Sequence, residues 1–311
     1  MVSIARSRVR IAGVGLLALG IATLGSGGPA TATRAAAKKE IVVKRITLTL
    51  VDGSRPTPPN GDYAGAPDRT LETVVSFPKD ASKQRPLPLV VFATGYGGTA
   101  TNYSDLYDHW VRAGYVVAAP TFPLSSEDAP GGQSPADVAS QPGDVSFVLD
   151  EVFRLNAEKG SDLFGLVDPD RVGLAGKSLG AITAFNLIFG PGHDEDRFQA
   201  LIPMTGLVGD DADFANVDIP LLLVHGDADT SVPIAGSQDA YARAQSPKFL
   251  VTIVGGTHGS AFGGGDDPSE VVVERTTTAF LDAYVKGKKA ALERLVRVGN
   301  VDGVASLEAS R

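Results

Sequence analysis

The chain has 311 residues, a formal net charge of −8 at pH 7 and no cysteine. Its length and its 43% hydrophobic residues suit one globular domain of the large α/β kind. The acidic charge disfavours nucleic-acid binding and gives no attraction to anionic membranes. The lack of cysteine excludes disulfides, a lipid-attachment thiol and thiolate metal sites.

The first 32 residues predict a secretory signal peptide that is cleaved after Ala32. Three arginines precede the apolar stretch 11–24, which is the order of charge and hydrophobicity found in such signals. At about 1.5 Å per residue this stretch spans roughly 20 Å, less than the roughly 30 Å of a bilayer's hydrocarbon core. We therefore expect residues 33–311 to be a secreted, single-domain protein, with a membrane anchor by the uncleaved segment as the alternative.

The segments that follow alternate between strand and helix patterns. Two of them, 45–51 and 71–77, alternate apolar and polar residues at period two and predict edge strands. Further strands are predicted at 88–93 and 115–119, helices at 103–113 and 144–153, and a loop at 120–132. Such alternation predicts a largely parallel sheet with helices on both faces.

The next motif, GKSLG at 176–180, lies between an apolar run at 171–175 and a helix-like segment at 181–188. This is the context of a nucleophile elbow, a sharp strand-to-helix turn that exposes a serine hydroxyl. Small residues on both sides of the serine let the strand and the helix come close together. The pattern predicts Ser178 as a nucleophile.

Two further chemical groups follow predicted strands. Asp229 lies in an acidic, turn-rich loop after the strand 219–224, and His258 follows the strand 248–254. The carboxyl ends of such strands are where an open α/β sheet places its ligand site. A serine becomes a nucleophile when an imidazole takes its proton, and a carboxylate holds that imidazole in the right tautomer. We therefore expect Ser178, Asp229 and His258 to form a triad, in the chain order typical of a nucleophile elbow.

An oxyanion hole is the remaining part of this chemistry. One donor is the backbone N–H of the residue after the nucleophile, here Leu179. The other comes from the loop after the third strand, and residues 89–98 have that strand-then-glycine form. The backbone N–H of Tyr96 is our candidate for this second donor.

Three motifs carry a resemblance to a known family. From about residue 45 to 286 the chain resembles the α/β-hydrolase superfamily, and within it the group of dienelactone hydrolases, platelet-activating-factor acetylhydrolases and cutinase-like polyesterases. The resemblance implies an α/β-hydrolase fold and a carboxylic-ester hydrolase with a Ser-Asp-His triad and no cofactor. The chain departs from the family at Lys177, where many members carry His, Asp, Glu or Tyr, and at Ala181, where a second glycine is common. The motifs that carry the resemblance are 94–98, 176–180 and 225–233.

The loop 206–218 is short and rich in aspartate, where many lipases, epoxide hydrolases and dehalogenases insert a helical cap. We therefore expect no large cap domain and an open cleft, which admits bulky or polymeric esters. Phe122 and Phe262, with Tyr96, are candidates for the lining of this cleft, and Lys177 is expected as a solvated side chain beside it. The polar tail 287–311 is interpreted as a helix or a frayed end.

Other residues compete for the triad roles. His225 ends a buried strand and is interpreted as a structural histidine, His109 as a surface or packed residue and His193 as a loop residue. Asp227 is interpreted as stabilising its own turn. Three acids after the apolar run 200–204 stay alternatives for the triad carboxylate: Asp210, Asp211 and Asp213.

The sequence thus predicts a secreted serine carboxylic-ester hydrolase that acts on small-molecule, lipid or polymeric esters. A serine peptidase or an acyltransferase on the same fold is the enzymatic alternative, and a non-catalytic secreted binding protein is the alternative from another class. No metal site is expected, because no two histidines have ligand spacing. No cofactor and no nucleic-acid partner are expected either.

Overall fold

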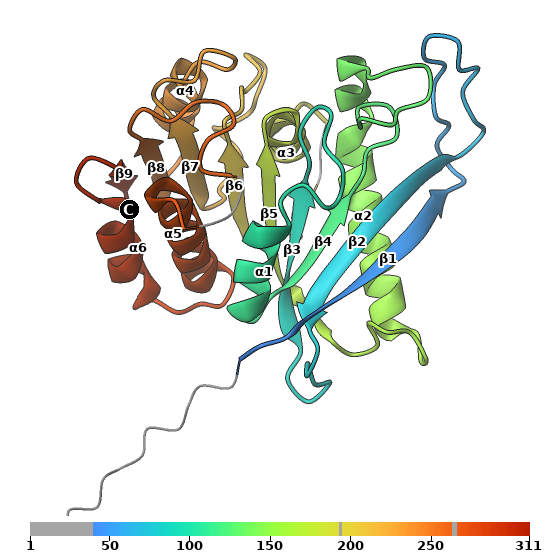
Figure 1. The fold of residues 1–311 in the computed structure, drawn as a ribbon, viewed down its shortest axis with the longest axis horizontal. Coiled ribbons are helices and arrows are strands. Elements are labelled where there is room, and N and C mark those ends of the chain that lie inside the picture. Colours follow the sequence, from blue (N-terminus) through green and yellow to red (C-terminus); the bar gives the residue numbers. More distant parts are fainter. Residues whose placement is uncertain (1–39, 193–194, 263–265) are drawn as a thin grey trace, which may run out of the picture. The chain divides into compact units, whose positions relative to one another are not determined.

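A sheet of nine strands runs through the part of the chain that the structure describes, in the order β1-β2-β4-β3-β5-β6-β7-β8-β9 (Figure 1). The structure is a computed structural model and describes residues 40–192, 195–262 and 266–311. The predicted signal peptide and His193 lie outside these residues. Residues Ile41–Arg311 form one unit.

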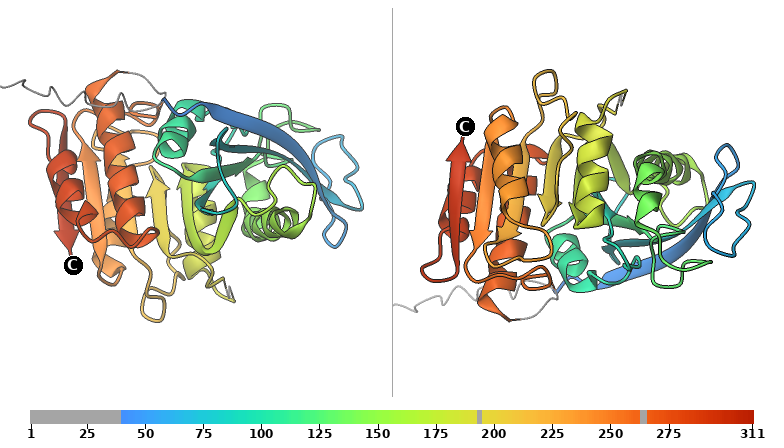
Figure 2. Two further views of the ribbon diagram at one scale, coloured as in Figure 1. Left: turned by 90° about the horizontal axis from the view of Figure 1, so that it is seen from below. Right: turned by 90° about the horizontal axis from the view of Figure 1, so that it is seen from above.

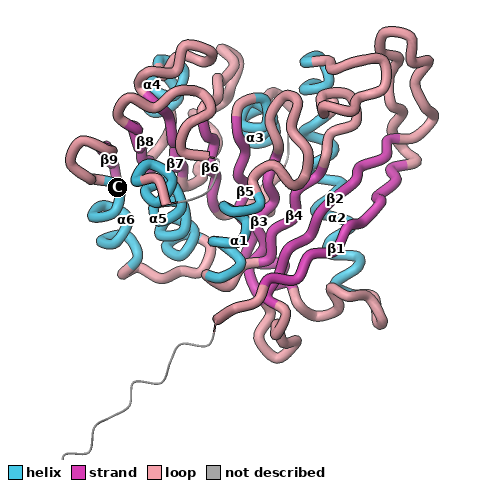
Figure 3. Tube along the Cα trace, in the orientation of Figure 1, coloured by secondary structure: helices cyan, strands magenta, loops and turns pink. Residues whose placement is uncertain are grey.

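The strands are parallel to their neighbours from β3 to β8, whereas β1, β2 and β9 pair antiparallel. Figure 3, in which strands are magenta, shows them as one continuous sheet with loops at the strand ends. The strands are β1 Val43–Asp52, β2 Arg69–Pro78, β3 Leu87–Ala93, β4 Val116–Pro120, β5 Val167–Lys177, β6 Ala200–Met204, β7 Leu221–Gly226, β8 Lys248–Ile253 and β9 Ala305–Ser310.

Helices cover both faces of the sheet (Figure 2). On each face, buried apolar side chains of the sheet and the helices form one cluster. On one face α2, α3 and α4 contribute to the core, and on the other face α1, α5 and α6 do. The helices are α1 Ser104–Arg112, α2 Gln141–Ala157, α3 Leu179–Phe189, α4 Ala235–Arg243, α5 Pro268–Tyr284 and α6 Ala291–Gly299, with a short 3₁₀ helix at Pro135–Ala139. The expected α/β class, with a mostly parallel sheet and helices, is confirmed.

One expectation about the sheet is wrong. The strand predicted at 71–77 is not at an edge, because β2 lies between β1 and β4. Its alternating pattern arises because one of its faces stays exposed at Thr70 and Glu72. The tail 287–311 was interpreted as a helix or a frayed end: the helix is present as α6, and the chain after it does not fray but forms the edge strand β9, which pairs with β8. Leu295 of α6 is fully buried, so the tail is part of the core that was expected to end at 286.

A buried cluster of charges joins β2 to the start of α2. Arg69 donates to both carboxylate oxygens of Asp144, at 2.6 Å each, and to Asp137 at 2.8 Å. All three side chains are excluded from solvent. Burial raises the pKa of Asp144 above its usual value, although the Arg69 guanidinium opposes that rise. The free energy of desolvating these charges is thus offset only while all of them stay paired.

We predict that Arg69→Met destabilises the fold by about 3–5 kcal/mol, because it leaves the buried carboxylate of Asp137 without its counter-ion and leaves Asp144 with only the partly exposed Arg55, at 2.9 Å. The free energy of unfolding in urea measures the effect. Arg154→Met is the matched control: Arg154 is an exposed arginine that pairs with Glu151 and Glu158 on the surface of α2, so its loss changes the stability little. Equal unfolding midpoints for the two variants would contradict the prediction.

Candidate active site

Ser178 lies on the turn between β5 and α3, in a backbone conformation that residues other than glycine rarely adopt. Its φ is 57° and its ψ is −119°, outside the regions open to most L-residues. A Cβ added at Gly176 would lie 2.2 Å from the carbonyl oxygen of Gly180, and one at Gly180 would lie 2.0 Å from that of Ala93. Only glycine fits at these two positions, so the sequence GKSLG is what allows so tight a turn.

The structure brings Ser178, His258 and Asp229 together. His258 Nε2 lies 2.9 Å from Ser178 Oγ, and His258 Nδ1 lies 2.7 Å from Asp229 Oδ2. An ionised carboxylate only accepts hydrogen bonds, so Nδ1 carries the proton and Nε2 is free to accept from the serine hydroxyl. In this arrangement the imidazole can remove the proton of Ser178 while the carboxylate stabilises the imidazolium that forms.

Asp229 is fixed and ionised by its surroundings. Its side chain is fully buried, and its Oδ1 accepts from the backbone N–H groups of Ser231 and Val232, both at 2.9 Å. Burial alone would raise the pKa of Asp229, but the hydrogen bonds from Val232 and His258 outweigh burial and hold the pKa below its usual value. Both carboxylate oxygens therefore have partners, and one of them always faces His258.

The loops that carry Asp229 and His258 are joined to each other. Ala228 donates its backbone N–H to the carbonyl of Gly256 at 3.0 Å, and Gly255 donates its N–H to Asp227 Oδ1 at 2.7 Å. Asp227 was expected to stabilise its own turn, and it instead binds the loop that begins at the end of β8. Its carboxylate thereby holds the loop of His258 against the loop of Asp229.

His225 is a structural histidine, as the sequence analysis interpreted it. Its Nδ1 lies 2.7 Å from Ser237 Oγ and its Nε2 lies 2.8 Å from the carbonyl oxygen of Val232. Burial lowers the pKa of His225, against the opposing effect of Val232 and Asp229. The ring is then neutral, with Nε2–H donating to Val232 and Nδ1 accepting from Ser237. Both ring nitrogens are occupied, which leaves neither for proton transfer.

The glycine loop after β3 lies against the serine. A Cβ added at Gly95 would lie 3.3 Å from Cβ of Ser178. Gly97 has a φ of 73° and donates its N–H to the carbonyl of Ser125 at 2.7 Å. Among the described residues, the backbone N–H groups of Tyr96 and Leu179 make no hydrogen bond to a turn or loop carbonyl.

The residues expected to line the cleft differ in their outcome. Phe122 is fully buried in the core beneath α2 and α3, so the expectation that it lines an open cleft is wrong; the loop after β4 turns this ring inward. The expectation of a solvated Lys177 is also wrong, because only 8% of that residue is exposed. Its Nζ lies 5.7 Å from the ring centroid of Phe262, within the range of a cation–π contact. Burial lowers the pKa of Lys177, and Asp229 opposes that shift.

The remaining candidates lie in other contacts. Asp213 accepts from the backbone N–H groups of Ala215 and Asn216 in its own turn. His109 Nδ1 lies 3.0 Å from a carboxylate oxygen of Glu274. In the part of the chain that the structure describes, Asp229 is the carboxylate that hydrogen-bonds to His258.

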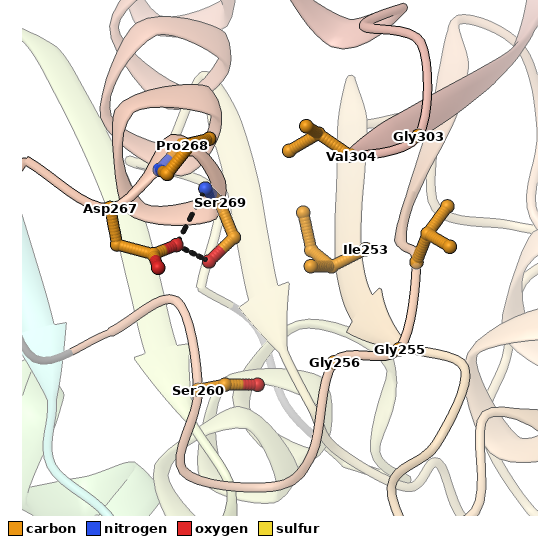
Figure 4. A pocket seen from close by; sticks show the side chains of 10 residues that line it. Ile253, Gly255, Gly256, Ser260, Asp267, Pro268, Ser269, Gly303 and Val304 are labelled. Carbon is orange, nitrogen blue, oxygen red and sulfur yellow. Dashed lines mark hydrogen bonds between the residues drawn. The ribbon is translucent and has the colours of Figure 1, made fainter. Parts of the chain in front are cut away.

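A cavity of about 290 Å³ lies between the end of β8, the start of α5 and the loop before β9 (Figure 4). Gly255, Gly256 and Ser260 line one side of it, on either side of His258 in the sequence. The start of α5 lines another side, where Asp267 accepts a hydrogen bond from the backbone N–H of Ser269 at 2.8 Å. Ser178, His258 and Asp229 do not line this cavity, so it is not a substrate site for Ser178.

Among residues 40–192, 195–262 and 266–311, no group of three or more His, Asp or Glu side chains is placed to hold a metal ion. In the same residues no helix has both the length and the apolar character of a membrane span. The sequence matches no protein-family model, and a search of curated proteins gives no match.

Proposed function

We propose that the protein is a serine carboxylic-ester hydrolase of the α/β-hydrolase superfamily. The observation that carries the proposal is the Ser178–His258–Asp229 array on a strand-to-helix turn, with hydrogen bonds of 2.9 and 2.7 Å. The order Ser, Asp, His along the chain is the order of that superfamily. The loop after β3 carries the candidate donor Tyr96, which agrees with where the superfamily takes its second oxyanion donor.

The proposed reaction has two halves. In the first, Ser178 Oγ attacks the ester carbonyl while its proton passes to His258 Nε2, and the alcohol then leaves with that proton. In the second, water gives a proton to His258 and attacks the acyl-enzyme, and the acid leaves as Ser178 regains its hydrogen. The N–H groups of Tyr96 and Leu179 would stabilise the oxyanion in both halves.

An open site is part of the proposal. The segment 205–220 contains no helix or strand, which agrees with the absence of a cap domain over Ser178. Tyr96 is 48% exposed, and its hydroxyl donates to the carbonyl of Gln133 at 3.2 Å. An exposed aromatic residue in the glycine loop suits bulky or polymeric esters. We also propose that residues 1–32 direct secretion, on the charge and hydrophobicity of that segment alone.

We predict that the purified protein hydrolyses p-nitrophenyl esters, tested as a series from acetate to palmitate, and that Ser178→Ala lowers kcat by about 10⁴–10⁶. The matched control is Ser306→Ala on the exposed edge strand β9, which keeps full activity. The rate of p-nitrophenol release measures both. Turnover that survives in folded Ser178→Ala would refute the assignment of the nucleophile, and a folded parent protein without activity would favour a peptidase, an acyltransferase or a binding protein.

A second prediction compares two aspartates of one loop. Asp229→Asn lowers kcat by about 10⁴, because the amide cannot hold His258 in the tautomer that accepts the serine proton. Asp227→Asn keeps an oxygen that accepts from the N–H of Gly255, and we expect its activity within about tenfold of the parent. Steady-state kinetics on one ester gives both values. Similar losses in the two variants would mean that Asp229 acts only through the shape of the loop.

A further inference from the structure

Three buried polar side chains lie between the two loops that carry the candidate oxyanion donors. Ser125 follows β4, Gln141 is the first residue of α2, and Thr183 is in the first half of α3. Their exposed fractions are 1%, 0% and 0%. Burying a polar group without a hydrogen bond costs free energy of folding. The hydrogen bonds of these three side chains therefore indicate their role.

These side chains form a continuous chain of contacts. At one end Ser125 accepts, through its carbonyl, the N–H of Gly97 at 2.7 Å, and its Oγ accepts from Gln141 Nε2 at 2.8 Å. At the other end Thr183 Oγ1 donates to Gln141 Oε1 and lies 3.0 Å from the carbonyl oxygen of Leu179, so its one proton is shared between two acceptors. This series of hydrogen bonds thus connects Gly97, the residue after Tyr96, to Leu179.

The sheet alone does not hold these two loops together. The pairing of β3 with β5 ends at Ala93 and Gly176, before either candidate donor is reached. Stabilisation of an oxyanion requires donors that are fixed before the reaction, about 2.7–3.1 Å from where the charge develops. A glycine-rich loop and a strained turn need further support to meet that requirement.

We propose that Ser125, Gln141 and Thr183 are positioning residues that fix the N–H groups of Tyr96 and Leu179 relative to each other. This inference rests on the proposed function, and it deepens that function by explaining how the oxyanion hole keeps its shape. We name the three side chains the oxyanion brace. The brace does not touch the substrate and acts only through the two backbone donors.

The oxyanion brace is itself anchored to the buried charge cluster. Asp137 Oδ2 accepts the N–H of Leu124 at 3.2 Å, next to Ser125. Asp144, one turn beyond Gln141 in α2, is held by Arg69 of β2. Both the loop after β4 and the start of α2 are thereby tied to the sheet, which gives the brace a rigid base.

The test is Gln141→Leu, which removes both amide contacts at nearly constant volume. Gln199→Leu is the matched control: Gln199 Oε1 accepts from the N–H of Val172 and its Nε2 donates to the carbonyl of Arg197 at 2.7 Å, near the start of β6 and remote from the carboxyl ends of the strands. We expect kcat of Gln141→Leu to fall about 10- to 100-fold with KM nearly unchanged, because the lost interaction acts in the transition state. The control keeps the kcat of the parent.

A milder pair covers the case in which Gln141→Leu does not fold. Thr183→Val is nearly isosteric and replaces the hydroxyl with a methyl group, and we expect kcat to fall about threefold to tenfold. Thr276→Val removes an equally buried hydroxyl, which donates to the carbonyl of Val272 at 2.7 Å in α5, and it should leave kcat unchanged.

A second readout separates positioning from folding. An aryl boronic acid adds to Ser178 Oγ and becomes a tetrahedral anion, whose oxygen meets the oxyanion donors as the transition state does. The active-site concentration used for kcat/KM comes from titration with a fluorophosphonate. In Gln141→Leu and Thr183→Val the inhibition constant of the boronic acid should rise by the same factor by which kcat/KM falls. Folded variants that keep the parent's kcat and boronate affinity would overturn the inference while the proposed function stands. A parent protein that neither hydrolyses esters nor binds the boronate would overturn the proposed function itself.

Discussion

The strained turn at Ser178 is the constraint on which the rest of the site depends. A serine at φ 57° and ψ −119° is held there only because β5 and α3 approach within contact distance, and that approach requires glycine at 176 and 180. The turn lifts the hydroxyl off the end of the sheet. Every other group of the site can be understood by its relation to that position, from the imidazole 2.9 Å away to the glycine loop that packs against the Ser178 Cβ.

Parallel strands explain why residues far apart in the sequence meet here. Asp229 and His258 follow β7 and β8, two neighbouring parallel strands. Their loops therefore begin at the carboxyl ends of the strands, as does the turn of Ser178. Strand direction alone leaves each loop free to move. The hydrogen bonds of Asp227 with Gly255 and of Ala228 with Gly256 connect these two loops. The oxyanion brace in the same way connects the glycine loop after β3 to the start of α3. The site is thus held by bonds between loops as much as by the sheet.

The parts of the fold and of the site that could be predicted are those that a short stretch of the sequence indicates by its own pattern. Ser178, Asp229 and His258 each lie within a few residues of the end of an apolar strand pattern, and the structure brings the three together. What could not be predicted depends on partners distant in the chain. A polar residue at the start of a helix, such as Gln141, has the pattern of a solvated position until its neighbours Ser125 and Thr183 are known. The inward turn of Phe122 and the pairing of the tail with β8 have no local signal for the same reason.

The most direct test of the account is covalent labelling of the folded protein with a fluorophosphonate, followed by peptide mass spectrometry to locate the adduct. Such a reagent reacts rapidly with a serine when a base removes the serine proton, fluoride leaves the phosphorus, and nearby donors stabilise the negative charge that develops on the phosphoryl oxygen. We expect one adduct per chain, on Ser178, and slow labelling of His258→Ala. An adduct on another residue, or no adduct on the folded protein, would contradict it.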